Sequence, residues 1–170
     1  MKNKNLIFQA FVPIPGFWSD EELAMKTKLA EDSSSFAKEY ADRVGADYCF
    51  EREQKIPDME PSHHTRFFHA FRATAPDWDD YDFVLYLDSD VIVKRDAPDI
   101  FEKGTDPLNQ FFACREIVDY EAFLAKKMVW KKQGWLRDHA YAYRFYNKWE
   151  QYFNAGMFMA GKRARRLLWD

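Results

Sequence analysis

The sequence predicts an α/β fold in which a mainly parallel β-sheet is covered by helices on both faces. Apolar runs of strand length alternate along the chain with longer segments of helical character, and strands that alternate with helices usually pair in parallel. The run Phe83–Leu87 shows no alternation of polar and apolar residues, as expected of a central strand buried on both faces. In such sheets ligands bind beyond the carboxyl ends of the strands, so the informative residues are expected there.

The bulk composition narrows the class of protein. The chain has 170 residues, of which 47% are hydrophobic and 31% charged, as in one soluble globular domain. We therefore expect a single domain over residues 1–170. The net charge of -3 argues against binding to nucleic acid or to an anionic membrane surface. The first apolar run is too short for a secretion signal or a membrane span, which predicts a cytoplasmic protein.

The N-terminal part is expected to form a strand and then a helix. The apolar run Leu6–Val12 predicts the strand. Ser19 and Glu22 have the spacing of a capping box, in which each side chain accepts from the other residue's backbone N–H at the start of a helix. Gly45 is suited to end the helix in a left-handed conformation. The intervening run Ser33-Ser34-Ser35 leaves open whether this segment is one helix or two.

The alternation continues to the end of the chain. The further elements predicted are a strand over Ala46–Phe50, a helix from Pro61-Ser62 with Phe67, Phe68 and Phe71 on its apolar side, a strand over Phe83–Val93, a short helix after Asp96–Asp99, a strand over Gln110–Cys114, a mostly helical region over Asp119–Gln151, a strand over Phe153–Ala160 and a helix over Lys162–Trp169. The basic residues of this last helix are expected on its solvated face; they are Lys162, Arg163, Arg165 and Arg166.

Two carboxylates, Asp88 and Asp90, follow the central apolar run directly. Residues i and i+2 of an extended chain point the same way, so both can reach one cation. Unpaired carboxylates at the end of a buried strand repel each other and lose hydration, and a divalent cation removes both problems. Oxygen ligands suit Mn²⁺ or Mg²⁺, with phosphate oxygens and water completing the shell. The alternative is a pair of solvated acids in a turn, since Asp-x-Asp alone is a common pattern.

Three segments together resemble the donor-site region of GT-A glycosyltransferases, and most of all family 8 and related nucleotide-sugar transferases. They are Tyr81–Val93 followed by Asp96–Glu102, the Phe-Asn-Ala-Gly strand within Tyr152–Met159, and the Arg-bearing helix segment Pro61–Phe68. The resemblance implies a three-layer α/β/α, Rossmann-like nucleotide-diphospho-sugar transferase fold with a mainly parallel mixed sheet. It also implies a hexosyltransferase that moves a sugar from a nucleoside-diphosphate sugar to a hydroxyl of a glycan or another acceptor, with UDP-sugars favoured over GDP-sugars.

The resemblance also implies roles for individual residues. It assigns Asp88 and Asp90 to Mn²⁺ (or Mg²⁺), with Asp88 also contacting the ribose of the donor. It places the end of the first strand, Phe11, Val12 and Pro13, against the nucleotide base. The donor sugar or diphosphate would be contacted by Arg66, Asn154 and Gly156.

The sequence departs from the family pattern beyond the Asn-Ala-Gly strand, which leaves alternatives open. The family usually supplies a histidine as third metal ligand well beyond the Asn-Ala-Gly strand, and none of the four histidines lies there. Either the chain lacks the usual C-terminal portion, or water and phosphate complete the metal shell. Two other functions remain as hypotheses: a non-catalytic nucleotide-sugar-binding module and, less favoured, a phosphohydrolase of the haloacid dehalogenase type.

Overall fold

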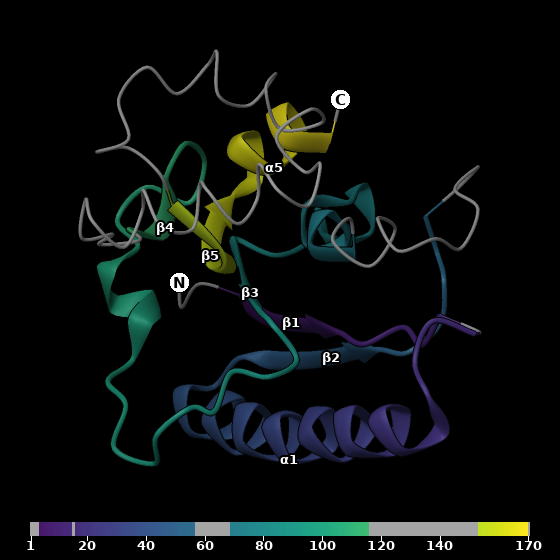
Figure 1. The fold of residues 1–170 in the computed structure, drawn as a ribbon. Helices are drawn as coiled ribbons and strands as arrows, with labels where there is room; N and C mark the ends of the chain where they lie inside the picture. Colours follow the sequence, from purple (N-terminus) through teal and green to yellow (C-terminus); the bar gives the residue numbers. More distant parts are fainter. Residues whose placement is uncertain (1–3, 15, 57–68, 116–152, 170) are drawn as a thin grey trace, which may run out of the picture. The chain divides into compact units, whose positions relative to one another are not determined.

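A computed structural model describes residues 4–14, 16–56, 69–115 and 153–169, with only the backbone described at 114, 115 and 153–155. The elements are β1 (Asn5–Ala10), α1 (Asp20–Val44), β2 (Asp47–Glu51), η1 (His69–Thr74), η2 (Pro76–Trp78), β3 (Phe83–Leu87), η3 (Ile100–Lys103), β4 (Phe111–Arg115), β5 (Phe153–Gly161) and α5 (Lys162–Trp169) (Figure 1). The chain divides into two compact units, one of residues 1–112 with 155–170 and one of residues 113–154. The contacts of the candidate site described below lie in the first unit.

The strands form one five-stranded mixed sheet in the order β2-β1-β3-β5-β4. Strand β1 pairs in parallel with both β2 and β3, and β5 runs antiparallel to β3. The predicted α/β architecture with a mainly parallel mixed sheet is therefore confirmed. Because β1, β2 and β3 run in the same direction, their carboxyl ends share one edge of the sheet.

Helix α1 begins and ends where its capping residues predict. The Ser19 Oγ accepts from the Glu22 N–H at 3.3 Å, and the Glu22 carboxylate accepts from the Ser19 N–H at 3.0 Å. Gly45 follows the helix with φ 71°, and its N–H donates to Ala41. The helix is continuous over 25 residues, so the run Ser33-Ser34-Ser35 does not divide it.

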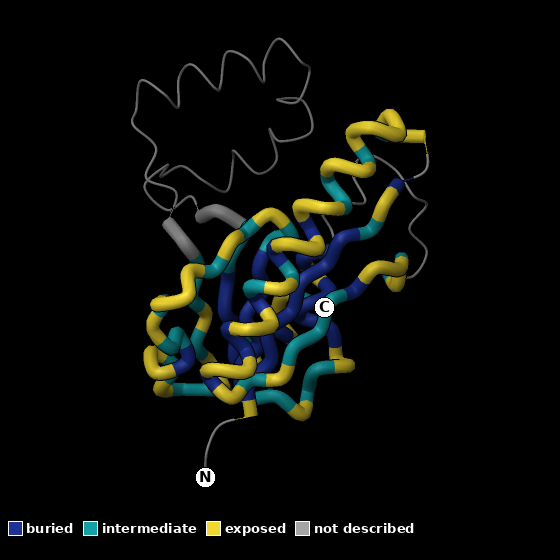
Figure 2. Tube along the Cα trace, turned by 90° about the horizontal axis from the view of Figure 1, so that it is seen from below, coloured by how far each residue is buried: buried dark blue, intermediate teal, exposed yellow. Residues whose placement is uncertain are grey.

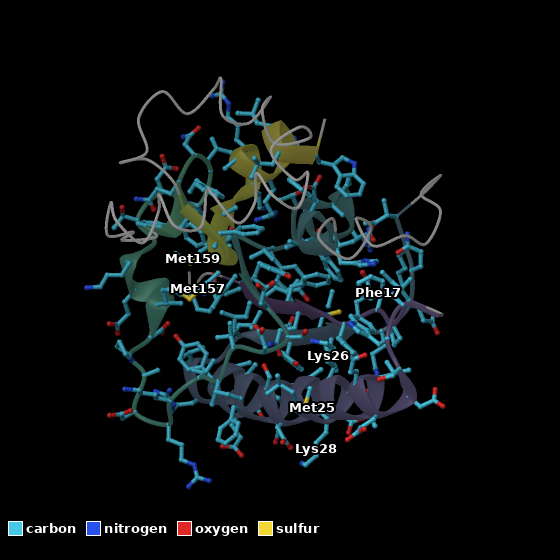
Figure 3. All side chains as sticks on the ribbon, in the orientation of Figure 1. Phe17, Met25, Lys26, Lys28, Met157 and Met159 are labelled. Atoms are coloured by element: carbon cyan, nitrogen blue, oxygen red, sulfur yellow. The ribbon has the colours of Figure 1, made fainter. Side chains whose placement is uncertain are left out.

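The two faces of the sheet have different partners, as Figure 1 shows, with α1 on one side and η1, η2 and α5 on the other. On the α1 side, a buried cluster joins sheet and helix; its members include Ile7, Ala37, Tyr40, Ala41, Phe83, Leu85, Leu87 and Met159. Met159 and its neighbour Met157, which packs against the cluster, are labelled in Figure 3. On the other side, a row of ring contacts runs through Trp78, Phe8, Tyr86, Phe158 and Phe111. Strands β1 and β3 are buried at every residue and form the interior between these layers, dark blue in Figure 2.

Strand β3 is shorter than its apolar sequence predicts. It ends at Leu87, whereas the predicted strand continued to Val93. The Val91 N–H donates to the Asp88 carbonyl at 3.0 Å, which turns the chain immediately after the strand. Val91 and Val93 are apolar because they pack against the α1-side cluster, not because they pair in the sheet.

The other predicted elements fall into three groups. The strands β2, β4 and β5 and the helix α5 lie within a residue or so of their predicted bounds. The short helix after Asp99 is the 3₁₀ helix η3, and the Asp99 carboxylate caps it by accepting from the Phe101 N–H at 2.9 Å. The helix predicted from Pro61 to Phe68 and the helical region Asp119–Gln151 lie outside the described residues. None of the helices in the described part of the chain has the length and apolar character of a membrane span.

Arg165 on α5 corrects the expectation that the basic residues of this helix are solvated. Arg163 and Arg166 are exposed, but the side chain of Arg165 is fully buried. Its guanidinium donates to the carbonyls of Ala160 at 2.9 Å, Trp78 at 2.9 Å and Tyr81 at 2.8 Å. The segment that precedes β3 presents carbonyls that need donors, and Arg165 supplies them and ties α5 to this segment.

We predict that Arg165→Met lowers the free energy of unfolding by roughly 2–4 kcal/mol, because several buried carbonyls lose a charged donor at once. Urea denaturation followed by circular dichroism measures the change. The matched control is Arg163→Met on the same helix, where the side chain is exposed and a small effect is expected. Equal destabilisation by the two substitutions would contradict this account of Arg165.

Candidate active site

Asp88 and Asp90 lie in a tight turn at the carboxyl edge of the sheet. The turn is closed by the hydrogen bond from the Val91 N–H to the Asp88 carbonyl. Asp88 is half-buried and Asp90 is exposed. The two acids are therefore near each other because the chain turns between them, and not because they alternate along an extended strand as the sequence argument assumed.

The turn is joined directly to the Asn-Ala-Gly segment of β5. The Asp88 N–H donates to the Gly156 carbonyl at 2.7 Å, which continues the antiparallel pairing of Leu87 with Met157. Two sequence motifs that are separated by more than sixty residues in the chain thus meet at one edge. The side chain of Asn154 is not among those described, and Arg66 lies outside the described residues.

The carboxylate of Asp88 lies in an unfavourable electrostatic environment. Burial raises its pKa, and the negative charge of Asp90 raises it further, whereas the hydrogen bond from Tyr86 acts in the opposite direction. The Tyr86 hydroxyl donates to Oδ1 of Asp88 at 2.6 Å. Burial and the two nearby carboxylates raise the pKa of Tyr86 well above its usual value, so this hydroxyl stays protonated and remains a donor. A cation beside the two acids would relieve their repulsion.

The donor set of this turn suits a hard divalent cation with few protein ligands. Within the described residues, no group of three or more His, Cys, Asp or Glu side chains is placed to hold a metal. The two carboxylates of the turn offer oxygen ligands, which suit Mg²⁺ or Mn²⁺ when water and phosphate oxygens supply the remaining ligands. Of the four histidines, only His69 is described; it is buried on η1, and burial lowers its pKa.

A buried hydrogen-bond network holds the backbone of this turn from the α1 side of the sheet. The Gln9 side-chain nitrogen donates to the Asp88 carbonyl at 3.0 Å and to the Ser33 hydroxyl at 3.0 Å. The Ser33 hydroxyl donates to the Val91 carbonyl at 2.6 Å. The Tyr48 hydroxyl donates to Oε1 of Gln9 at 2.7 Å. Both carbonyls at the ends of the turn are thereby fixed by side chains from β1 and α1.

Sequence reasoning did not assign Gln9, Ser33, Tyr48 and Tyr86 to the site. Two features of the sequence could have pointed to them. Gln9 interrupts the otherwise apolar first strand, and Ser33 lies inside a helix where serine has no structural advantage. A polar residue on a buried face requires hydrogen-bond partners, and here those partners are the carbonyls of the acidic turn.

The residues expected to contact a nucleotide base follow the end of β1. The Phe11 N–H donates to the Glu51 carbonyl at 2.9 Å, which extends the pairing of β1 with β2. The Phe11 ring is buried and stacks on Trp18 with ring centroids 6.2 Å apart. Val12 is partly exposed and Pro13 is exposed. Because β1 neighbours β3, these three residues lie at the same sheet edge as Asp88.

A buried ion pair lies at this edge of the sheet, where β2 ends. Arg72 of η1 contacts both carboxylate oxygens of Glu51 at 3.2 Å, and its Nη2 lies 2.7 Å from a carboxylate oxygen of Asp77. Glu51 and Arg72 are almost fully buried. Lys55 also lies 3.3 Å from a carboxylate oxygen of Glu51, so both acids of this cluster, Glu51 and Asp77, have a basic partner.

The chain is similar to a known protein family and to a solved structure. Residues 14–166 match the protein family described as glycosyl transferase family 8. Among solved structures, the chain is similar to that of a glycosyltransferase involved in the glycosylation of the major capsid of PBCV-1, with a TM-score of 0.57 and 17% sequence identity. The similarity covers 97% of this chain and 63% of the other, and at this identity it shows the fold alone. A comparison with curated proteins found no match.

The raised pKa of Asp88 predicts a pH dependence of stability in metal-free protein. Stability associated with a carboxyl whose pKa is raised by folding is fully present below the unfolded-state pKa and is lost as the pH rises through the folded-state pKa. Asp88 thus destabilises the metal-free fold near neutral pH. We expect Asp88→Asn to melt at a higher temperature than the wild type at pH 7 in EDTA, and the difference to shrink as the pH is lowered.

Thermal melts of both proteins over a series of pH values test this expectation. Asp90→Asn removes one of the two causes of the raised pKa, so it should reduce the contribution of Asp88 without abolishing it. A lower melting temperature for Asp88→Asn at pH 7, or a difference that does not change with pH, would show that Asp88 is not electrostatically strained.

Proposed function

The chain belongs to glycosyl transferase family 8, and on that basis we propose that it transfers a sugar, as a hexosyltransferase, from a nucleoside-diphosphate sugar to an acceptor hydroxyl. The observation that carries the proposal is the acidic turn of Asp88 and Asp90, which is hydrogen-bonded to Gly156 of β5 at the carboxyl edge of the sheet. Ligands bind at this edge in α/β sheets, and a cation there would stabilise the charged form of Asp88, which burial and the neighbouring Asp90 disfavour.

Asp88 and Asp90 would hold the cation, Mn²⁺ or Mg²⁺. When bound, the cation would neutralise the charge that develops on the departing diphosphate. The hydroxyl of Tyr86 donates to one oxygen of Asp88, so the carboxylate is fixed in direction and its other oxygen would contact the cation. The proposed role of Asp88 also includes a hydrogen bond to the ribose of the donor.

The donor would extend along the sheet edge in both directions from the acidic turn. Its base would lie against Phe11, Val12 and Pro13 beyond β1, and we propose a uracil base in preference to guanine. Its sugar and diphosphate would approach Gly156 and Asn154 of β5 and the Arg66 guanidinium. The acceptor would be a glycan or another molecule with a free hydroxyl. No residue is assigned here as a general base or a nucleophile.

One alternative from the sequence makes a different prediction for the same site. A non-catalytic module would bind the nucleotide sugar through the same residues but would not break its glycosidic bond. The phosphohydrolase hypothesis receives no support from the family to which the chain belongs. Binding and turnover must therefore be measured on the same protein preparation.

We expect release of nucleoside diphosphate from a UDP-sugar in the presence of a glycan acceptor and Mn²⁺, and no release in EDTA. Asp88→Ala and Asp90→Ala should each lower turnover by about 10²–10³-fold, the scale on which one preorganised electrostatic group acts in catalysis. A panel of UDP-sugars and GDP-sugars, assayed by product release, also tests the preference for the base.

The matched control for these variants is Asp80→Ala. Asp80 is an exposed acid that precedes β3 at the opposite end of the strand from Asp88, and its substitution should leave turnover unchanged. Turnover that is equal in Mn²⁺ and EDTA would contradict the role of the metal. Tight binding of a nucleotide sugar without turnover of any donor would favour the non-catalytic module.

A further inference from the structure

The hydrogen-bond network of Gln9 and Ser33 has only one consistent arrangement of its protons. The Asp88 carbonyl can only accept a hydrogen bond, so the atom of the Gln9 amide that faces it is the nitrogen. The single hydroxyl proton of Ser33 is directed to the Val91 carbonyl, so Ser33 accepts from the same nitrogen. Both amide hydrogens of Gln9 are therefore used, and its oxygen accepts from Tyr48.

This arrangement fixes the two ends of the acidic turn separately. Gln9 holds the carbonyl at the first residue of the turn, Asp88, and Ser33 holds the carbonyl at the last residue, Val91. Both side chains are fully buried, so water does not compete for these hydrogen bonds. Among the described residues, the network bonds to the backbone of the turn and makes no hydrogen bond to the carboxylates of Asp88 or Asp90.

The Asp88 carboxylate and the network lie on opposite sides of the turn. Gln9 and Ser33 approach from the α1 side of the sheet, where Ile7 and Ala37 are neighbours in the core cluster. The Asp88 carboxylate lies with Tyr86 on the side of the aromatic row. The backbone of the turn is therefore held from the α1 side, while the Asp88 carboxylate lies on the opposite side of the sheet.

We propose that Gln9 and Ser33 are positioning residues that fix the separation and direction of the Asp88 and Asp90 carboxylates and thereby set the selectivity of the site between Mg²⁺ and Mn²⁺. The inference rests on the proposed function. Mg²⁺ requires near-ideal octahedral geometry at short distances, whereas the larger Mn²⁺ tolerates more variation. Loss of one of the two hydrogen bonds to the turn should therefore weaken Mg²⁺ binding more than Mn²⁺ binding. A packing defect in the core alone would lower stability and would change the affinities for both ions by the same factor.

The test compares Ser33→Ala with the wild type. Each cation is titrated into protein saturated with UDP, and its affinity is measured by isothermal titration calorimetry. Loss of one buried hydrogen bond should weaken Mg²⁺ binding about 5- to 10-fold. We expect Mn²⁺ binding to weaken only about 2-fold, so that the ratio of Mg²⁺ to Mn²⁺ affinity falls about 2.5- to 5-fold. The control is Ser35→Ala, an exposed serine of the same run, for which the ratio should equal that of the wild type.

A second variant keeps the test decisive if Ser33→Ala does not fold. Tyr48→Phe removes the hydroxyl that orients the Gln9 amide, leaves both tethers of the turn in place, and lies at a partly exposed position. It should lower the same ratio by a smaller factor than Ser33→Ala. An unchanged ratio in the folded variants, with wild-type binding intact, overturns the positioning role alone. A wild type that binds no cation with UDP overturns the proposed function, and the inference with it.

Discussion

The burial of the Asp88 carboxylate at the end of β3, with the negative charge of Asp90 beside it, is the constraint on which the rest of the site depends. The pKa of Asp88 is raised by burial and by its acidic neighbour. The charged form of this carboxyl group is therefore disfavoured when no cation is bound. A carboxyl group in this environment keeps its position because the surrounding hydrogen bonds fix the backbone of the turn. Here the Asp88 backbone is hydrogen-bonded to Gln9, Val91 and Gly156.

The mixed sheet is what brings these partners together. Parallel pairing of β1 with β3 places Gln9 next to the turn, and antiparallel pairing of β5 with β3 places Gly156 on its other side. The two faces of the sheet contact different parts of the turn. The α1 face supplies Ser33 to the backbone of the turn, and the aromatic face supplies the Tyr86 hydroxyl to the Asp88 carboxylate. Buried polar networks of this kind stabilise only if every member is satisfied, and the Gln9 amide is.

The sequence predicted the elements better than it predicted the site. Local patterns were sufficient for α1, because its capping residues act within a few positions of the helix ends, and for β3, because an apolar run needs no partner to be recognised. The end of β3 was predicted wrongly because Val91 and Val93 are apolar for packing against the core. Gln9, Ser33 and Asp88 were not connected because their contacts span 24 to 79 residues of sequence, a distance over which residue periodicity carries no information. Arg165 was predicted to be exposed because its buried partners are carbonyls, which no sequence pattern marks.

The central claim is that Asp88 and Asp90 bind one divalent cation together with the diphosphate of a donor. Crystals grown with UDP and Mn²⁺, with diffraction data collected at the manganese absorption edge, test it most directly. The account predicts one anomalous peak between the two carboxylates and the diphosphate, with oxygen ligands from both aspartates at roughly 2.0–2.4 Å. Bound UDP with no peak at this turn, or a manganese ion bound away from both aspartates, would contradict it.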